Sequence, residues 1–366
     1  MNTTVPVARR NILSDRRRLV ISTLGVGLAV ALILLLEGLW GGLLAGVSAY
    51  PDRVGASLFV REPGTMVLTE GAVPLSAVAT IQAIPGVQRA DPVLAKYVIL
   101  DLHGTKEAVS VIGFRPGSMG GPWDIIAGRT VQADGEVAMD QSLAGDHGIG
   151  VGDTIAVQGQ TFPVMGLSSR TRTFTGGGFV FMSLAAAERL FGESRTATFI
   201  LVRASDPASV EAAIRARTRL AVDPPAAIAA GEREVYAGIL GRVFNLMLLI
   251  AFAAGTLIVA LTVYSGVVDR LREYGIAKAM GAGRTRLFRI VAGQTLVLAT
   301  LGTLEGFVLF AIGSRVLVSV RPQFPSSLTS GAVAGVVLAA GVMALLAAIV
   351  PTHRVARLDP ASVYRG

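Results

Sequence analysis

Four long stretches of apolar residues dominate the pattern of hydrophobic and polar positions along this chain. They run from Leu19 to about Leu36, from about Val243 to Val268, from about Ile290 to Val320, and from Gly331 to Val350. A helix needs about 20 apolar residues to cross the roughly 30 Å hydrocarbon core of a bilayer, and each stretch is close to that length or longer. The pattern therefore predicts a polytopic membrane protein with four transmembrane helices.

The first stretch could instead belong to a secretory signal peptide, in which a basic segment also precedes an apolar run. The run is long for such a segment, and no clear small-residue cleavage site follows it. It continues as EGLWGGLLAGVSAY, in which Trp40 and Tyr50 are of the type that anchors helices at membrane interfaces. We therefore expect residues 19–47 to form a transmembrane helix.

Lysine and arginine positions predict the orientation of the helices, because cytoplasmic loops near membrane spans carry an excess of these residues. Three segments are rich in them, with Arg9, Arg10, Arg16, Arg17 and Arg18 in the first, Arg270, Arg272, Lys278, Arg284, Arg286 and Arg289 in the second, and Arg354, Arg357 and Arg365 in the third. Residues 1–18, 269–289 and 351–366 are therefore expected in the cytoplasm, and the 321–330 loop outside. This describes a multi-pass protein of the inner or plasma membrane with both termini in the cytoplasm, and third and fourth spans over 290–320 and 331–350.

The overall composition agrees with this topology and excludes other classes of protein. The 366 residues are 52% hydrophobic and only 16% charged, whereas a soluble domain is nearer one quarter charged. The net charge of +8 is explained by the basic residues beside the spans, and no separate basic stripe predicts nucleic-acid binding. Because the chain has no cysteine, it has no disulfide framework and no thiolate metal site.

Residues 48–235 separate the first two spans and are expected to form an extracytoplasmic α+β domain of two lobes. Strands are expected at 57–61, 65–69, 179–182 and 198–203, helices at 75–84, 184–191 and 207–220, and hairpins at 93–102 with 107–113 and 154–157 with 161–166. After Asp223-Pro224-Pro225, a long helix is expected to run from about Gly231 into the second span. Residues 236–268 would then form a stalk and the second transmembrane helix.

No pattern in this domain predicts catalysis or a metal site. The histidines, His103, His147 and His353, are far apart in the sequence and lack the spacing of metal ligands. Asp140 and Asp146 flank a short helical segment, where capping or solvation is a commoner role than acid–base catalysis. We therefore expect no catalytic residue in this domain.

Nucleotide chemistry is also not predicted for this chain. Gly176, Gly177 and Gly178 resemble a phosphate-binding loop only superficially, because no Lys-Ser/Thr pair follows them, and a flexible loop is expected there. The sequence contains no Walker A pattern. We expect no cofactor and no enzyme activity in the chain itself, so any ATP that drives the protein must be hydrolysed by a partner.

The cytoplasmic loop after the second span reads DRLREYGIAKAMGAGRTRLFRI, from Asp269 to Ile290. Leu271, Tyr274, Ala277 and Gly281 fall on one face at helical spacing, which predicts a short amphipathic helix at the membrane surface. The alternative is an ordinary positive-inside loop with no further role, and composition alone favours it.

The run REYGIAKAMGAGRTRLF within this loop resembles the REIGIxRAxGAxRxxI signature of the FtsX-like permease domain. The matching positions are Arg272, Glu273, Gly275, Ala279, Gly281 and Ala282. The tail from Pro351 to Gly366 resembles the closing pattern of that family, and the segment from Glu136 to Leu167 resembles the extracytoplasmic core domain of MacB-type permeases. Together the resemblances cover nearly the whole chain, and the layout is similar to the stand-alone permeases LolC/LolE and DevC.

The resemblance implies a fold of four transmembrane helices with an inserted α+β domain of the MacB core-domain type. It also implies the permease subunit of an ABC transporter, which couples ATP hydrolysis in a separate ATPase subunit to export or extraction of a substrate on the extracytoplasmic side. The coupling loop would contact the ATPase through Arg272, Glu273, Tyr274, Gly275, Ala279, Gly281 and Ala282. The other implied partners are a second permease copy or a paralogue, membrane lipid and an extracytoplasmic adaptor. An FtsX-like signalling scaffold that regulates cell-envelope enzymes is the alternative, although its outside domain is usually smaller.

Glu305 is an ionisable residue within the third span, and such residues are costly in a bilayer and often functional. It lies about 24 Å along the helix from Arg289, at 1.5 Å per residue. This places it toward the outer side, where water or Arg315 would satisfy it, and favours a structural or interfacial role. A proton-driven secondary transporter would need more spans and more intramembrane carboxylates.

The topology can be tested with two single-cysteine variants, Gly159→Cys and Gly283→Cys, because the chain has no native cysteine. We expect the Gly159→Cys variant to react with a membrane-impermeant maleimide on intact cells. The Gly283→Cys variant should react only after permeabilisation, since the positive-inside rule places its loop in the cytoplasm. Labelling of both variants from the same side would contradict the proposed orientation.

Overall fold

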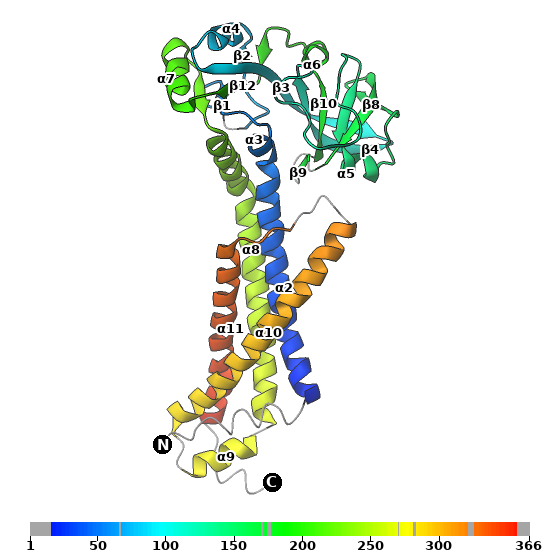
Figure 1. Cartoon of the computed structure of the whole chain (residues 1–366). Coiled ribbons are helices and arrows are strands. Elements are labelled where there is room, and N and C mark those ends of the chain that lie inside the picture. The colour runs from blue at the N-terminus through cyan, green and yellow to red at the C-terminus, as the bar shows by residue number, and fades with distance from the viewer. Residues whose placement is uncertain are drawn as a thin grey trace. The chain divides into compact units, whose positions relative to one another are not determined.

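The structure is a computed structural model that describes residues 16–65, 67–169, 171–173, 177–269, 271–280, 283–320 and 326–356. These residues form two compact units. One unit contains residues 16–42, 242–320 and 326–356, and the other contains residues 43–241, within the described ranges. The chain enters and leaves the second unit through two long helices, so that unit is an insertion in the first (Figure 1).

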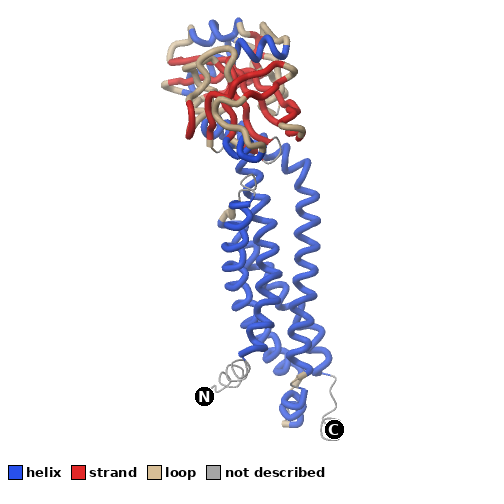
Figure 2. Tube along the Cα trace, turned by 90° about the vertical axis from the view of Figure 1, so that its right-hand side faces the viewer, coloured by secondary structure: helices blue, strands red, loops and turns tan. Residues whose placement is uncertain are grey.

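The first unit is built from long helices, shown as blue coils in Figure 2. They are α2 (Arg16–Val47), α8 (Pro225–Val268), α10 (Arg284–Val320) and α11 (Ser330–Ala356), with the short α9 (Leu271–Ala279) between α8 and α10. By length and composition, α2, α8, α10 and α11 each contain a segment able to cross a membrane. The four predicted spans are therefore confirmed as apolar helices.

The helices differ from their predicted extents mainly at their ends. Helix α8 begins at Pro225 rather than near Gly231, because proline is well tolerated in the first turn, where its missing N–H has no helical partner. Helix α10 begins at Arg284, within the predicted loop. Helix α11 continues beyond Val350 to Ala356, into the segment predicted as a tail.

Small residues allow α2, α8 and α11 to pack closely at one point in this unit. A Cβ atom added to Gly255 of α8 would lie 3.1 Å from Cβ of Ala29 in α2 and 3.0 Å from Sδ of Met343 in α11. Lipid provides no hydrophobic drive for helix association, so van der Waals contact between closely approaching backbones is the main source of stability. Gly255 permits that approach.

The second unit is built on one mixed, mostly antiparallel sheet with the strand order β13-β1-β12-β3-β4-β10-β6-β8-β5. These strands are β1 (Leu58–Arg61), β3 (Val87–Leu102), β4 (Thr105–Phe114), β5 (Ile125–Gly128), β6 (Val137–Asp140), β8 (Gln160–Ser168), β10 (Gly177–Ser183), β12 (Phe199–Ala204) and β13 (Ala221–Asp223). Strand β7 (Thr154–Val157) pairs with β8, β9 (Arg172–Thr173) with β10, and β2 (Val73–Pro74) with β11 (Thr196–Ala197).

The two predicted lobes share this sheet through the long strand β3. The first part of β3 pairs with β12, and the part from Leu94 to Leu102 pairs with β4. Helices α4 (Ser76–Gln82) and α7 (Pro207–Arg217) pack beside β1 and β12, whereas α5 (Gln141–Asp146) and α6 (Leu184–Phe191) pack beside β6 and β10 (Figure 1). A third buried cluster, rich in aromatic residues, includes Tyr50 from the short helix α3 (Ala49–Arg53).

Most of the predicted elements of this unit are confirmed. The β3–β4 hairpin turns at His103-Gly104, both with positive φ, and the β7–β8 hairpin turns at Gln158-Gly159. Asp140 is the N-cap of α5 and accepts hydrogen bonds from the amides of Ser142 and Leu143, which confirms its capping role.

Two local predictions are wrong. The strand expected at 65–69 is not formed. Residues 62–65 and 67–72 form a turn-rich loop, called the 62–72 loop below, in which the amide of Ala72 donates to Oε2 of Glu62 at 2.9 Å. The glycine-rich segment does not remain a loop throughout, because Gly177 and Gly178 lie in β10. Gly176 lies outside the described residues.

Candidate functional site

One face of helix α9 packs against the long helices of its own unit. Tyr274 is only 5% exposed and belongs to the apolar cluster of those helices, against which Leu271 also packs. The hydroxyl of Tyr274 donates a hydrogen bond of 2.9 Å to Oε1 of Gln294 in α10. The predicted apolar face is confirmed for Leu271 and Tyr274, and it joins α9 to the third span.

Other side chains of α9 point away from this cluster. Arg272 and Glu273 are exposed, and Ile276 is 39% exposed, whereas Gly275 is buried. Helix α9 therefore presents a mixed charged and apolar surface beyond its anchored face. Ala279 ends the helix, while Gly281 and Ala282, the last two predicted contact positions, lie outside the described residues.

Glu305 of α10 forms a hydrogen bond to the first span. The hydroxyl of Thr23 in α2 lies 2.8 Å from Oε1 of Glu305, and Thr23 is only 2% exposed. Among the described residues, Oε2 of Glu305 is buried without a hydrogen-bond partner. The structural role is consistent with this contact. Of the two partners expected from the sequence, water or Arg315, Arg315 is not the partner: it is exposed and lies ten residues further along α10, about 15 Å at 1.5 Å per residue.

Glycines place α2 and α10 in close contact around Glu305. A Cβ atom added to Gly302 would lie 2.5 Å from Cβ of Val26, and one added to Gly306 would lie 2.8 Å from Cβ of Val30. A Cβ atom added to Gly27 of α2 would lie 3.0 Å from Cβ of Glu305. Gly302 and Gly306 thus form a GxxxG pair, which lets two helix backbones approach without intervening side chains.

In the second unit, two successive residues at the start of α8 hold two different segments. Arg233 donates to Oγ of Ser48 at 2.6 Å and lies 3.3 Å from Oδ2 of Asp52. The side chain of Glu232 points elsewhere: its Oε1 accepts a hydrogen bond of 3.2 Å from the amide of Leu68, in the 62–72 loop. The start of α8 is therefore tied both to the end of α2 and to this loop.

Glu232 is a buried acidic residue of this unit, with only 5% of its surface exposed. It precedes the apolar run of α8, which starts near Val243, and so lies outside the predicted membrane span. Burial raises the pKa of Glu232 to about 7, an effect opposed by the Leu68 hydrogen bond and reinforced by the negative charge of Asp52. Since folding raises this pKa, the contribution of Glu232 to stability is greatest below about pH 4.5 and is lost as the pH rises toward 7.

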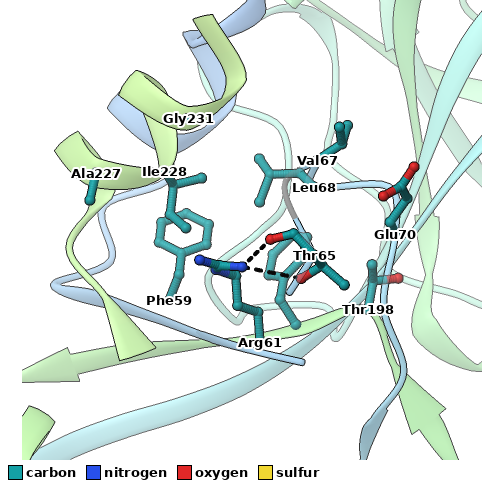
Figure 3. Close-up of a pocket in the computed structure, with 11 residues that line it drawn as sticks. Phe59, Arg61, Thr65, Val67, Leu68, Glu70, Thr198, Ala227, Ile228 and Gly231 are labelled. Atoms are coloured by element: carbon teal, nitrogen blue, oxygen red, sulfur yellow. Dashed lines mark hydrogen bonds between the residues drawn. The ribbon is translucent and has the colours of Figure 1, made fainter. Parts of the chain in front are cut away.

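The 62–72 loop separates two small cavities, each lined in part by Val67, Leu68 and Phe199. Figure 3 shows the first, of about 70 Å³, where Ala227, Ile228 and Gly231 of α8 lie opposite the loop. In this view the guanidinium of Arg61 reaches the carbonyl and hydroxyl oxygens of Thr65. Arg61 also pairs with Asp223 at 2.9 Å, so it fixes the loop to the sheet.

The second cavity, of about 50 Å³, lies on the other side of Leu68. Its lining includes Glu232 and five aromatic residues, which are Tyr50, Tyr97, Phe179, Phe199 and Tyr236. The sequence did not point to this site, because its residues are spread from the end of α2 to the start of α8. The only local signal was an acidic residue near the apolar start of a long helix.

Two histidines that are far apart in the sequence are close in space, contrary to expectation. Nδ1 of His103 lies 2.8 Å from the carbonyl oxygen of His147, and Nε2 of His147 lies 3.3 Å from Oε1 of Glu107. The angle of the second contact does not meet that of a hydrogen bond. Within the described ranges, no group of three histidine or carboxylate side chains is placed to hold a metal ion.

These features define a class of protein: a membrane protein of four apolar helices with a folded domain inserted between the first and second. Two family models match this arrangement, the MacB-like periplasmic core domain over residues 19–220 and the FtsX-like permease C-terminal domain over residues 245–360. The chain belongs to the family of FtsX-like permeases that carry a MacB-like periplasmic core domain. The resemblance noted in the sequence is thereby confirmed.

Several named proteins are similar to the chain over most of its length. An uncharacterised ABC transporter permease of Mycobacterium tuberculosis is 26% identical over 98% of this chain and 99% of its own length. One from Methanocaldococcus jannaschii is 20% identical over 99% and 97%. The pyoverdine export ATP-binding/permease protein PvdT of Pseudomonas putida is 26% identical over 94% of this chain and 57% of its own length.

Among solved structures, the periplasmic region of MacB from Actinobacillus actinomycetemcomitans aligns with 48% of this chain. The alignment covers 91% of that region, at 13% sequence identity and a TM-score of 0.38.

The close contact between α2 and α10 predicts how the chain responds to a side chain at Gly302. Gly302→Val should destabilise the full chain in detergent by about 1–3 kcal/mol, because the new Cβ would overlap Val26. Gly293→Val is the matched control: it places the same β-branched residue in α10 at a position with open space around it. Equal thermal stability of the two variants would show that the close contact does not contribute.

Proposed function

We propose that the chain is the permease subunit of an ABC transporter, in which a separate ATPase subunit drives export or extraction of a substrate on the extracytoplasmic side. The observation that carries the proposal is helix α9, which lies between two apolar helices and is anchored to one of them through Tyr274 and Gln294. Its Arg272 and Glu273 are exposed. Membership of the FtsX-like permease family supports the same role.

The contacts within the helical unit suggest how a displacement of α9 would be transmitted to the other helices. A displacement of α9 would load α10 directly, because Tyr274 is bonded to Gln294. Helix α10 would load α2 through Glu305, Thr23 and the glycine contacts around them. Since α2 and α8 each supply residues to both compact units, these helices would carry the movement toward the outside domain.

The relatives support the assignment of ATP hydrolysis to a different chain. The permease from M. tuberculosis is matched over nearly its whole length, whereas PvdT, whose name includes both ATP-binding and permease, is matched over 57%. The 366 residues contain no Walker A pattern that would hold ATP phosphates. In this proposal the permease would also pair with a second copy or a paralogue, with both termini in the cytoplasm.

The purified chain alone should neither bind nor hydrolyse ATP. Nucleotide binding would be measured with a fluorescent ATP analogue, and turnover by phosphate release, in a preparation checked by mass spectrometry for co-purifying ATPases. Turnover in a preparation free of such partners would contradict the division of labour between two chains.

Glu273→Lys should weaken binding to the cognate ATPase by about tenfold, because reversing a charge at a docking surface opposes the partner's complementary charge. Binding would be measured by co-purification and by stimulation of ATP turnover in nanodiscs. Glu234→Lys is the control, since it reverses an exposed charge in the outside domain and should leave both readouts unchanged.

The same monodispersity and thermal stability are required of both variants, so that weakened binding is not confused with misfolding. If a well-folded Glu273→Lys chain binds and stimulates the ATPase like the wild type, α9 is only a topological anchor.

A further inference from the structure

The second cavity of the outside domain combines a buried acid with aromatic walls. Glu232 lines this cavity. Among the described residues its side chain accepts one hydrogen bond, which comes from the amide of Leu68. Within the described part of the chain, Glu232 forms no ion pair. The adjacent Arg233 is directed to Ser48 and Asp52, on a different side of α8.

The electrostatic surroundings of Glu232 favour a positive ligand. Among the described residues that line the cavity, Glu232 is the one carboxylate, there is no Lys, Arg or His, and the other titratable groups are the phenols of Tyr50, Tyr97 and Tyr236. Beyond the lining, the negative charge of Asp52 acts on Glu232, and Arg233 is paired with Asp52. A buried carboxylate without a cationic partner is costly, so it takes up either a proton or a cation.

The aromatic residues that line the cavity favour an organic ammonium ion as the cation. Aromatic rings attract ammonium groups, and five aromatic residues line this cavity together with one acidic residue. Tyr50 is held in place by its hydroxyl, which donates to the carbonyl of Gly120 at 3.1 Å, and its ring packs 5.8 Å from Phe179 and 5.9 Å from Phe199. The rings of Tyr50, Phe179 and Phe199 are thus fixed by the core of the domain.

The size and polar lining of the cavity narrow the ligand further. A volume of about 50 Å³ suits a small head group and is too small for a drug-sized molecule. Ser110 also lines the cavity. Its hydroxyl and the Glu232 carboxylate are acceptors for the N–H groups of a primary ammonium, which a quaternary ammonium lacks.

We propose that this cavity binds a primary alkylammonium group, with Glu232 as its counter-ion and the aromatic side chains as its walls. The ammonium replaces the proton that Glu232 otherwise carries, and the alkyl chain extends out of the open cavity. Because burial raises the pKa of Glu232 to about 7, the ligand must displace that proton at lower pH and binds more tightly at higher pH. The proposal does not depend on the transport role, since binding requires no ATPase.

The test is a calorimetric titration of the full chain in detergent with n-butylammonium chloride, in sodium phosphate at constant ionic strength. Amine buffers are avoided because they contain the proposed ligand group. The affinity should be about tenfold higher at pH 8 than at pH 6, as the ionised fraction of a group with a pKa near 7 changes by about that factor. Butylammonium itself stays charged at both values. The neutral analogue n-butanol should bind at least tenfold more weakly at pH 8 and show no pH dependence.

Glu232→Gln should abolish the pH dependence and weaken butylammonium binding at pH 8 at least tenfold. This variant keeps an oxygen that can accept the Leu68 hydrogen bond, so the loop should remain in place, which hydrogen exchange of residues 62–72 would check. Glu234→Gln is the matched control, because it removes an exposed charge two residues away on the same helix and should bind like the wild type.

Tyr236→Leu provides a second variant that retains the acid. It should weaken butylammonium binding severalfold while butanol binding stays unchanged, since only the cation interacts with the ring face. The proposal is overturned if wild type binds butylammonium no more tightly than butanol. It is equally overturned if a folded Glu232→Gln chain binds butylammonium like the wild type at pH 8.

Discussion

The approach of α2 to α10 is so close that glycines at the contact have no room for side chains, and much of the helical unit depends on it. Gly302 and Gly306 face Val26 and Val30, and the Thr23–Glu305 hydrogen bond lies between the same two helices. In lipid, neither a longer side chain nor a water molecule could fill the same gap without separating the helices. This contact therefore determines which surface of α10 faces α2 and which remains for α9 and α11.

A comparable arrangement holds the start of α8 in the second unit, with polar contacts in place of glycines. Arg233 holds Ser48 and Asp52 at the end of the first helix, and Glu232 holds Leu68 in the loop. Two successive side chains on a helix point about 100° apart, so one turn of α8 can tie down two segments at once. A change in the protonation of Glu232, or a ligand bound to it, would thus alter the contact with the loop first and the Arg233 contacts least.

The features that the sequence predicts well are those produced by local pattern. The four apolar runs, the His103-Gly104 turn and the cap at Asp140 each depend on residues within one short window, and each is confirmed. Residues 65–69 resemble a strand in sequence because Val67 and Leu68 belong to a short apolar run between threonines, whereas the Glu62 and Arg61 contacts that bend the 62–72 loop are not visible in such a pattern. The sequence does not identify Thr23 as the partner of Glu305 for a related reason. A position counted along one helix does not show which residue of another helix lies beside it.

Glu232 and Glu305 show how much of a site sequence analysis can leave out, because the sequence identifies Glu305 without its partner Thr23 and does not single out Glu232 at all. Neither belongs to a motif, and each has its recorded partner far away in the chain, at Leu68 and at Thr23. A buried carboxylate is costly unless it is paired and hydrogen-bonded, so fold stability alone gives little reason to retain one. At Glu305 the hydrogen bond to Thr23 and the fitted glycines supply a reason, because they specify one helix pairing among many apolar alternatives. At Glu232 one hydrogen bond from a backbone amide does not offset the free-energy cost of burying a carboxylate beside Asp52. A ligand of opposite charge therefore accounts for the acid better than the Leu68 contact does.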